Sequence, residues 1–421
     1  MAALARDIAA RGHRSTFLHI GDAEPLLRES GLAFRVVGQG SHPPGSLAGA
    51  VRRMGAVNGP IGLGGIIRDV AAITDMLCRD LPSALREIGT DCLVCDQTEA
   101  AGGLVARHLG MPFVSVANAL PLNREPGIPP PFTPWRYDAS RWGVERNLGG
   151  YRVSDILMRP VSSVIRHYAT LWSLDPLRTI EDCASPLAQV AQLVPGLDFP
   201  RQALPETFHY CGPFRDEETV PRDFSMPGRD GRPLVYLSLG TLQGGRARLF
   251  RVLSGAAHRA GTQPILSHAG RLSAEDAARL PGRPAAFAWV PQRRVMAEAE
   301  LALFNGGQNT MLDAAAAGIP VVVIPIAFEQ AAIGARIAWA GAGRTVSRRF
   351  LTAGRLAGII RHILNEPSYR MAAQRLRAEI GQAGGVRLAA RIVERVAATG
   401  APVTTSDVRR SPDLAVPGDV A

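Results

Sequence analysis

The chain alternates short apolar runs with helical patterns, and this alternation constrains the fold more than any other feature of the sequence. One helical segment, 99–110, lies between two of the apolar runs and ends at Gly110. Strands that alternate with helices in this way form a parallel sheet with helices on its faces. The pattern therefore predicts an α/β fold. In the first half of the chain, the predicted strands are 14–21, 32–38, 91–97 and 112–118.

The alternation stops in an irregular stretch rich in proline and glycine, 193–232, and then restarts. We place a domain boundary there, so that two doubly wound halves face each other across a cleft. In the second half, the predicted strands are 233–240, 263–270, 285–290, 300–305 and 321–328. The predicted division is an N-terminal domain at 1–205, a linker at 206–232, a C-terminal domain at 233–398 and a disordered tail at 399–421.

Composition and charge exclude several classes of protein. The 421 residues are 46% hydrophobic and 20% charged, which is typical of a globular protein. The net charge is +10, but the arginines are scattered, so nucleic-acid binding is not expected. No apolar run reaches the roughly 18 residues of a membrane span, and no secretory signal opens the chain. These features predict a cytoplasmic location.

The five cysteines do not suggest a disulfide framework, because their number is odd and they are widely spaced. Cys92 and Cys95 form a C-x-x-C pattern inside a predicted strand. A redox or metal pair would need a turn or a second pair of ligands there. We therefore expect both residues to belong to the core.

Two glycines between a predicted strand and a predicted helix, Gly306 and Gly307, mark a candidate anion site. Glycine lets the backbone approach a ligand closely, and the start of the helix, 308–317, offers free N–H groups. Asn309 and Thr310 could add side-chain donors. A phosphate or diphosphate site and a simple packing joint explain this stretch equally well.

Further residues at predicted strand ends face the same edge of the sheet. The segment 238–244 again places Ser, Gly and Thr after a strand. Trp289 could stack on a nucleobase or lie in the core, and Asp313 could bind ribose hydroxyls or interact with the helix dipole. Glu329 and Gln330 could bind a sugar, or Glu329 could be a surface charge. The chain has no G-x-x-x-x-G-K-[ST] motif, which argues against a P-loop enzyme.

Together these residues form a spaced series: W-x-P-Q at 289–292, G-G-x-N-T-x-x-D at 306–313, G-I-P at 318–320 and E-Q at 329–330. The series resembles the donor-binding signature of nucleotide-sugar-dependent GT-B fold glycosyltransferases related to the plant secondary-product enzymes. Longer segments resemble the bacterial zeaxanthin glucosyltransferases of carotenoid biosynthesis, at 41–49, 74–82, 115–126, 192–205 and 238–244. The resemblance implies two Rossmann-like domains and inverting glucosyl transfer from UDP-glucose to a hydroxyl of a carotenoid such as zeaxanthin.

By this resemblance, Trp289 would stack on uracil, Gln292 would contact the base or ribose, and Asp313 would hold the ribose hydroxyls. The diphosphate would be surrounded by Thr241, Gly307, Asn309 and Thr310. Glucose would be bound by Glu329 and Gln330. No cofactor or metal would be needed, and no metal-ligand cluster is evident in the sequence. The candidate donor-binding residues are Ser238, Gly240, Thr241, Trp289, Val290, Gln292, Asn305, Gly306, Gly307, Asn309, Thr310, Asp313, Glu329 and Gln330.

The sequence departs from the family pattern at two places. Asp96 matches the acid that orients a catalytic His, but the matching His and its strand are missing, because the chain starts inside the following helix. We expect a start codon assigned too late or a fragment, an N-terminal lobe without its first strand, and poor catalysis. Asn305 stands where the family usually has a His that donates to the diphosphate. Asn305→His is therefore predicted to improve donor binding or turnover.

Several alternatives remain open. The acceptor could be another apolar molecule, such as a sterol, terpenoid or macrolide, and the protein could bind a nucleotide sugar without catalysis. A sugar-nucleotide epimerase could use the same architecture. Since a carotenoid is dissolved in lipid, a peripheral membrane contact is expected near the proline-rich loop at 121–135 and the predicted helix at 151–175. Trp135 and Trp142 could be interfacial anchors or core residues.

Overall fold

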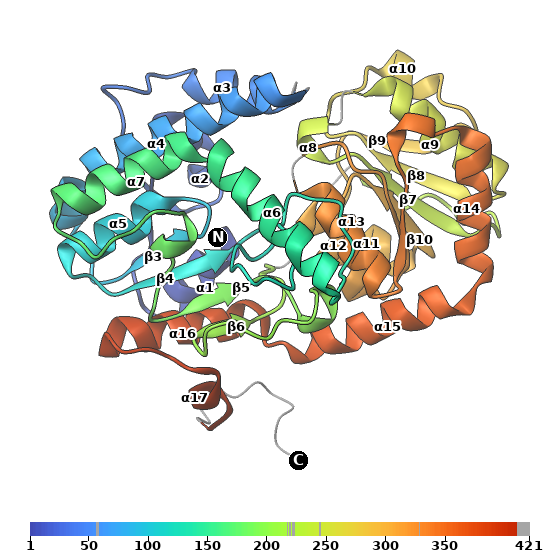
Figure 1. Cartoon of the computed structure of the whole chain (residues 1–421). Helices are drawn as coiled ribbons and strands as arrows, with labels where there is room; N and C mark the ends of the chain where they lie inside the picture. Colours follow the sequence, from blue (N-terminus) through green and yellow to red (C-terminus); the bar gives the residue numbers. More distant parts are fainter. Residues whose placement is uncertain are drawn as a thin grey trace.

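The computed structural model describes residues 1–55, 59–216, 218, 220, 224–243, 246–327 and 329–410. Two α/β lobes lie side by side, the N-terminal lobe on the left and the C-terminal lobe on the right of Figure 1. All the paired strands in both lobes are parallel. The predicted α/β fold with two Rossmann-like lobes is confirmed.

The C-terminal lobe contains a six-stranded sheet whose connections run in two directions from its centre. From β7 the chain proceeds through β8 to β9, and from β10 it proceeds through β11 to β12 on the other side. The order reverses between β7 and β10, and ligands bind outside the carboxyl ends of the strands at such a switch point. In spatial order the strands are β12 (Gly343–Thr345), β11 (Val321–Val323), β10 (Leu301–Phe304), β7 (Leu234–Ser238), β8 (Gln263–Ser267) and β9 (Ala285–Phe287).

Helices cover both faces of this sheet. One face packs against α9 and α14, through residues such as Phe250 and Ile360. The other face packs against α11, α12, α13 and α15, and its core continues into the N-terminal lobe through Leu197 and Phe208. The helices are α8 (Gly240–Gln243), α9 (Ala247–Arg259), α10 (Ala274–Ala278), α11 (Gln292–Glu298), α12 (Gln308–Ala317), α13 (Gln330–Trp339), α14 (Ala353–Asn365) and α15 (Pro367–Gln382), with a 3-10 turn η4 (Arg348–Phe350).

The strands of the N-terminal lobe form two separate sheets. The first contains β1 (Thr16–His19) and β2 (Ala33–Val36). The second contains β3 (Leu93–Asp96), β4 (Phe113–Ala117), β5 (Gln189–Ala191) and β6 (Phe208–Tyr210). Within the described part of the chain, β1 pairs only with β2 and β3 pairs only with β4, so each has one edge without a partner strand. The short strands β5, β6 and β12 were not predicted from the sequence.

The helices of the N-terminal lobe were predicted in part, since α2, α3 and α4 were not expected from the sequence. The segment predicted at 151–175 is two helices, and the first begins ten residues earlier, at Arg141. The proline-rich loop at 121–135 has no helix or strand, as predicted. No helix in the described ranges is long and apolar enough to cross a membrane. The helices are α1 (Ala2–Ala10), α2 (Glu24–Arg28), α3 (Ser46–Gly55), α4 (Gly59–Ile88), α5 (Ala100–Leu109), α6 (Arg141–Leu157) and α7 (Arg159–Leu171), with 3-10 turns η1 (Gly21–Ala23), η2 (Glu181–Cys183) and η3 (Pro195–Leu197).

The last helices return to the N-terminal lobe, along the lower edge of Figure 1. Helix α16 (Gly385–Thr399) packs on α1 and β4. The prediction of a disordered tail from 399 is wrong for the residues up to 410, because a helix α17 (Thr405–Arg410) forms there. Val403 is buried, and its N–H donates to the carbonyl of Leu187 at 2.8 Å. The remainder of the predicted tail, 411–421, lies outside the described residues.

The cysteines within and beside β3 behave as core residues rather than as a reactive pair. All five cysteines are free thiols. Burial raises the pKa of Cys92 to about 11 and also raises the pKa of Cys95. A thiol with a raised pKa is a poor nucleophile and a poor metal ligand at neutral pH. The prediction that Cys92 and Cys95 lack a redox role is consistent with this environment.

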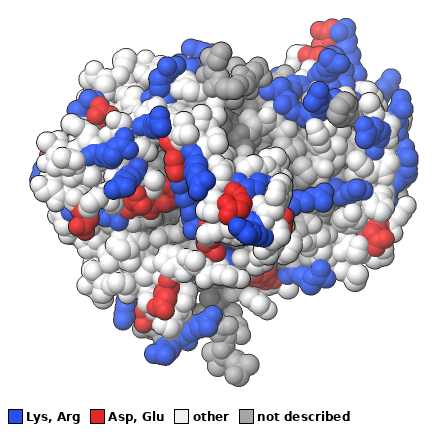
Figure 2. Space-filling model, in the orientation of Figure 1, with Lys and Arg blue, Asp and Glu red and all other residues white. Residues whose placement is uncertain are grey.

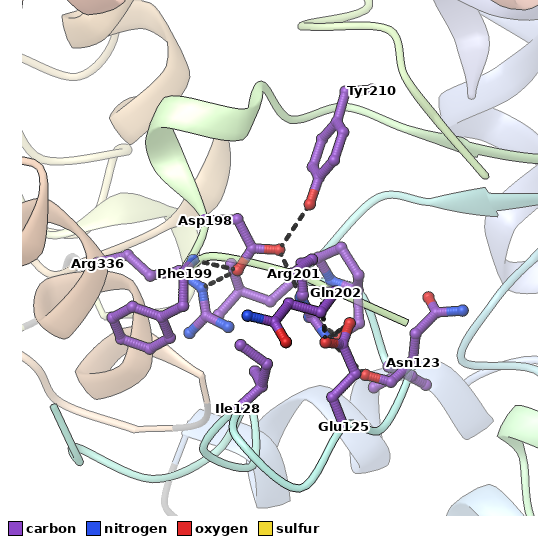
Figure 3. Close-up of polar contacts among 12 residues, drawn as sticks. Asn123, Glu125, Ile128, Asp198, Phe199, Arg201, Gln202, Tyr210 and Arg336 are labelled. Carbon is purple, nitrogen blue, oxygen red and sulfur yellow. Dashed lines mark hydrogen bonds and ion pairs between the residues drawn. The ribbon is translucent and has the colours of Figure 1, made fainter. Parts of the chain in front are cut away.

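A buried ionic cluster joins the two lobes. Figure 3 shows Arg336 of α13 pointing at Asp198, which follows η3 in the other lobe. The Arg336 Nε lies 2.8 Å from one oxygen of Asp198, and the Arg201 Nε lies 2.9 Å from the other. Burial tends to raise the pKa of Asp198, but the two guanidinium groups outweigh it and lower the pKa. Asp198 is therefore a buried carboxylate whose charge is balanced from both lobes.

The same cluster anchors the proline-rich loop. The carboxylate of Glu125 accepts a hydrogen bond from the Gln202 N–H at 2.8 Å, and Arg201 donates to the Asn123 carbonyl at 2.7 Å. The ring of Phe199 lies beneath the Arg336 guanidinium, 4.4 Å from its carbon to the ring centre. Buried polar groups satisfied in this way fix the geometry around them. The cluster thus sets the position of α13, whose first turn lies at the candidate site.

Candidate active site

The loops that follow β7 and β10 lie side by side at the switch point. Phe304 pairs with Ser238 in the register of the two strands, so both chains leave the sheet at the same level. Gly240 has a φ of +68°, and a Cβ added there would lie 3.4 Å from the amide of Asn305. The described part of the segment 238–244 thus lies beside Asn305, the residue before the glycine pair. Thr241 is exposed within the short helix α8.

The two glycines of the β10–α12 connection have different tasks. Gly306 has a φ of +93°, and a Cβ there would lie 2.8 Å from the carbonyl oxygen of Gln330 and 2.9 Å from Val323. Any other residue would clash with these neighbours, so Gly306 serves packing. Gly307 is the N-cap of α12 and no side chain caps that helix. A Cβ on Gly307 would meet nothing closer than Asn305 at 3.7 Å, so the backbone is accessible there.

Gln308, the first residue of α12, was not among the predicted site residues. Its side chain is only 6% exposed, yet neither atom of its amide has a hydrogen-bond partner among the described residues. A buried amide without partners is costly, and a bound ligand or water can remove that cost. The unpartnered amide of Gln308 and the uncapped helix leave polar groups at this end of α12 that a polar ligand or a water could satisfy. Its signal in the sequence was its place between Gly307 and Asn309.

A second group of polar contacts surrounds Asp313 on the same helix. Gln292 donates from Nε2 to one Asp313 oxygen at 2.6 Å, and its own Oε1 accepts from the Tyr236 hydroxyl at 3.1 Å and from Thr310 at 3.4 Å. Arg215 donates from Nε to the other Asp313 oxygen at 2.7 Å. Hydrogen bonds thus bring Gln292, Thr310 and Asp313 together, and each Asp313 oxygen keeps a lone pair for a hydroxyl group.

Arg215 is a further residue that the sequence did not reveal. It lies in the predicted linker, 98 positions before Asp313 in the chain. Besides Asp313, it donates from Nη2 to the carbonyl of Asn309 at 3.1 Å. A contact of this sequence separation leaves no local pattern, so only the folded structure could reveal it.

The remaining predicted donor residues border the same edge of the sheet. Trp289 lies just beyond β9 and is 59% exposed, so the alternative of a core tryptophan is wrong, and Val290 is its neighbour. Glu329 is the N-cap of α13, and burial raises its pKa, which argues against a simple surface charge. Gln330 accepts from the N–H groups of Ile326 at 2.8 Å and Ala327 at 3.0 Å, and thereby fixes the loop after β11.

A cavity of about 460 Å³ lies where the two lobes meet. Among the predicted donor residues only Asn309 lines it. Asp96 lies near its N-lobe wall, since Asn118 lines the cavity and donates to Asp96 at 2.6 Å. The other Asp96 oxygen accepts from the backbone N–H and hydroxyl of Thr98. No histidine is among the hydrogen-bond partners of Asp96 in the described residues. The cavity is lined by Met1, Ala2, Ala3, Asn118, Gln192, Phe214, Arg215, Asp216, Arg293 and Asn309.

Known proteins resemble this chain over nearly its whole length. Residues 261–394 match the family described as erythromycin biosynthesis protein CIII-like, C-terminal domain. The chain is 39% identical over 404 residues to a zeaxanthin glucosyltransferase of Pantoea ananas, covering 95% of this chain and 93% of that protein. A zeaxanthin glucosyltransferase of Pseudescherichia vulneris is 38% identical over 403 residues, covering 94% of each. The chain belongs to the zeaxanthin glucosyltransferase family.

A solved structure agrees with this assignment at the level of the fold. The crystal structure of a calicheamicin glycosyltransferase superposes with a TM-score of 0.74 over 95% of both chains, at 20% identity. As a member of the zeaxanthin glucosyltransferase family, the chain is a nucleotide-sugar-dependent glycosyltransferase with the GT-B fold. The matched segment 261–394 contains the predicted donor residues from Trp289 to Gln330, whereas Asp96 and the loop after β7 lie outside it.

No separate metal centre is evident beside these residues. Among the described residues, no group of three or more His, Cys, Asp or Glu side chains is arranged to hold a metal ion. The polar groups at the switch point are instead amides, hydroxyls, a guanidinium group and helix N–H groups, with Asp313 and Glu329 as the carboxylates. This set is suited to bind phosphate oxygens and sugar hydroxyls.

Proposed function

We propose that this enzyme transfers glucose from UDP-glucose to a hydroxyl group of a carotenoid such as zeaxanthin, with inversion at the anomeric carbon. The main support is the 39% identity to the Pantoea ananas zeaxanthin glucosyltransferase, because it extends over both lobes. The N-terminal lobe is where an acceptor would bind, and the C-terminal lobe is where a donor would bind. A similarity confined to the C-terminal lobe would support only the donor half of the proposal.

The donor would lie along the carboxyl ends of β7 and β10. The diphosphate would bind to the N–H groups at the start of α12, with Asn309, Thr310, Thr241 and the unpartnered Gln308 nearby. Ribose would contact Asp313, and uracil would stack on the exposed ring of Trp289. Glu329 and Gln330, at the start of α13, would receive the glucose hydroxyls.

The proposed reaction forms one bond and breaks one bond at the anomeric carbon. The acceptor oxygen bonds to that carbon while its bond to the phosphate oxygen breaks, and UDP leaves with the electron pair. The α12 N–H groups would stabilise the charge that develops on UDP. The acceptor hydroxyl must lose its proton to a base. In the family pattern this base is a histidine oriented by the acid that Asp96 matches, and no histidine bonds to Asp96 among the described residues.

A direct assay tests donor and acceptor together. The purified protein is incubated with zeaxanthin in detergent micelles and either UDP-glucose or dTDP-glucose, and the pigments are separated by chromatography. We expect carotenoid glucosides, formed faster from UDP-glucose. A sterol, a terpenoid alcohol and a macrolide serve as competing acceptors. If one of these is glucosylated faster than zeaxanthin, that molecule and not the carotenoid is the preferred acceptor. Release or epimerisation of the sugar without any acceptor would contradict glucosyl transfer.

One observation favours a second function, binding of a nucleotide sugar without transfer. The partners of Asp96 in the described residues are Thr98 and Asn118, where the family pattern has a histidine. Under this alternative, UDP would bind in a calorimeter while no acceptor is glucosylated. Under the main proposal, binding and transfer would both be observed.

We also propose that the enzyme works at the cytoplasmic face of a membrane, since its acceptor is dissolved in lipid. Large apolar side chains of α6 are exposed on one face of the helix: Trp142, Val153, Ile156 and Leu157. In Figure 2, arginine side chains with acidic side chains among them lie over the part of the surface where Figure 1 places α6, and the arginines would be attracted to anionic lipid. Sedimentation with phosphatidylglycerol vesicles should therefore exceed sedimentation with phosphatidylcholine vesicles, and Trp142→Ala should reduce it.

The other tryptophan considered as an anchor is placed less favourably. Trp135 is partly buried, and its ring lies beneath the guanidinium group of Arg146. A Cβ added to Gly150 of α6 would lie 2.7 Å from the Trp135 ring, so the indole fills a space inside the lobe. The proposed membrane contact therefore uses α6, with Trp142 rather than Trp135 as the tryptophan anchor.

A further inference from the structure

An unbroken series of hydrogen bonds crosses the cleft between the two lobes. It starts at Asp96, which accepts from Asn118 at 2.6 Å, and Asn118 accepts from Gln192 at 2.5 Å. Gln192 accepts from the Nη1 of Arg215 at 3.4 Å, and Arg215 donates from Nε to Asp313 at 2.7 Å. The series therefore joins the carboxylate at the end of β3 to the carboxylate on α12.

The residues of this series are held firmly in place. Gln192 is only 5% exposed, and its Oε1 also accepts from the N–H of Phe214 at 3.0 Å. Arg215, the next residue, is fixed a second time by its bond to the Asn309 carbonyl. Asn118, Gln192, Arg215 and Asn309 all line the 460 Å³ cavity. A ligand in the cleft would therefore lie against the middle of the series.

The direction of every bond in the series is fixed by its two ends. An ionised carboxylate only accepts and a guanidinium group only donates. Asp96 therefore orients the Asn118 amide with its NH2 toward the carboxylate, and Arg215 orients the Gln192 amide with its oxygen toward the guanidinium. The two amides can then meet in one way only, with the Gln192 NH2 donating to the Asn118 oxygen. Reversal of either amide would leave two like groups facing each other.

We propose that Arg215 is a positioning residue that couples donor binding at Asp313 to the orientation of Asp96, through Gln192 and Asn118. The inference rests on the proposed function, which gives Asp313 and Asp96 their roles. Ribose hydroxyls that donate to the remaining lone pairs of Asp313 draw negative charge from its bond to Arg215, so Arg215 bonds more closely to Gln192 when the donor is present. The series of hydrogen bonds then fixes the orientation of Asp96 for the transfer step.

Gln192→Glu tests the series because it changes one bond and keeps the shape of the side chain. The new carboxylate still accepts from Arg215 and Phe214, but it can no longer donate to Asn118. The Asn118 amide must then reverse and present its oxygen to Asp96. We expect a loss in kcat of about tenfold, and a change in the KM for UDP-glucose of no more than about fivefold, which is the size expected for loss of the coupling.

The loss should be reversed at low pH, because the introduced carboxyl group regains a donor when it is protonated. The ratio of the variant's kcat to the wild-type kcat, measured at each pH, should therefore rise as the pH falls. A purely structural effect of Gln192→Glu would lower the folding midpoint and leave this ratio independent of pH. A kcat equal to wild type at all pH values would overturn the proposal.

A double-mutant cycle on UDP binding tests the coupling without any need for transfer. Asn118→Ala, Arg215→Met and the double variant are titrated with UDP by calorimetry. Asn118 lies outside the proposed UDP contacts and can affect UDP binding only through the series. Asn118→Ala should therefore change the Kd for UDP by about fivefold when Arg215 is present. In the Arg215→Met background it should leave the Kd unchanged. Equal effects of Asn118→Ala in both backgrounds would refute the coupling.

Arg6→Met provides the matched control for this cycle. Arg6 also pairs with the linker, at Asp216, but lies outside the series. The changes in UDP binding free energy caused by Arg6→Met and by Asn118→Ala should add in the double variant. If they do not add, the coupling is not specific to Arg215, and its assignment to that residue would be overturned. If the wild type binds UDP but glucosylates no acceptor, the proposed function fails, and the binding cycle still decides whether the two lobes are coupled.

Discussion

At the scale of single residues, the candidate donor site contains two kinds of side chain. Gln292, Asp313 and Gln330 are held by several hydrogen bonds, so their positions are set before a ligand arrives. Trp289 is exposed, and Gln308 is buried without a partner among the described residues. The first kind supplies geometry, whereas the second kind has surface or polar atoms that a ligand could contact.

Trp289→Ala should weaken UDP binding and leave stability almost unchanged. The exposed ring contributes little to the core, but a stacked base is worth about 1–3 kcal/mol. Isothermal titration with UDP measures the affinity, and thermal unfolding measures the stability. Trp142→Ala removes another exposed tryptophan, on α6, and should leave UDP affinity unchanged in the absence of membranes. Equal effects of the two substitutions would contradict the stacking role.

Asn305→His should strengthen the diphosphate site. Asn305 is buried at the end of β10, beside Gly240, and its amide carries no charge. A protonated imidazole would replace a neutral hydrogen bond by a charge-assisted one, a gain of about 1–2 kcal/mol. UDP affinity and kcat should rise below the pKa of the new histidine. Asn305→Gln keeps a neutral amide and should raise neither UDP affinity nor kcat. If Asn305→His raises neither of them, Asn305 does not contact the diphosphate.

At the scale of elements, the β10–α12 connection separates packing from binding in two adjacent glycines. Gly306→Ala would force a Cβ against Gln330 and Val323 at a positive φ, so we expect a loss of stability of roughly 1–3 kcal/mol. Gly307→Ala has room for its Cβ and an ordinary φ of −69°, so the fold should tolerate it. Its methyl group would instead narrow the approach to the helix N–H groups. Urea unfolding and UDP titration of both variants distinguish the two effects.

The opposite result for this pair would be informative. If Gly307→Ala unfolded the protein while Gly306→Ala bound UDP normally, the assignment of packing to Gly306 and binding to Gly307 would be reversed. A stable Gly307→Ala variant with normal UDP affinity would show that the start of α12 does not contact the diphosphate.

Helix α5 introduces a dependence of stability on pH. The Glu99 side chain caps α5 at the N–H of Ala101 and accepts from Thr74, and burial raises its pKa to about 7. In the unfolded chain the Glu99 carboxyl group loses its proton near pH 4, whereas in the folded protein it keeps the proton up to about pH 7. Protonated Glu99 therefore contributes to the free energy of unfolding at low pH. This contribution is lost as the pH rises through about 7, with a slope of at most about 1.4 kcal/mol per pH unit.

Glu99→Gln should abolish this part of the pH dependence, because its amide does not titrate and its oxygen can still cap α5. The measurement is urea unfolding of both proteins at several pH values between about 5 and 8. The free energy of unfolding of the wild type should fall relative to that of the variant as the pH rises. Parallel curves for the two proteins would mean that Glu99 titrates normally.

Several elements could be predicted from the sequence because their signals are local. The helix at 308–317 agrees with α12 to the residue, since glycine precedes it and Gly318, in the left-handed conformation, ends it. β5, β6 and β12 have three residues each, too few for a periodic pattern. Their pairing depends on strands far away in the chain.

At the scale of the whole molecule, the two lobes are joined in three ways. Helices α15 and α16 carry the chain from the C-terminal lobe back to the N-terminal lobe. The apolar core around Leu197 continues into the C-terminal lobe, and Asp198 forms an ion pair with Arg336. The sequence predicted two lobes and a cleft, but not these contacts. Arg215 and Gln192 were missed for the same reason, since each acts on a residue that is remote in sequence.

The anomeric configuration of the product tests inverting glucosyl transfer most directly. UDP-glucose carries an α-linked glucose, so a single displacement must give a β-glucoside. The protein is incubated with UDP-glucose and zeaxanthin, and the purified product is analysed by proton NMR at the anomeric position. We predict a β-glucoside of zeaxanthin. An α-glucoside would contradict inversion, and release of free glucose with the pigment unchanged would contradict transfer itself.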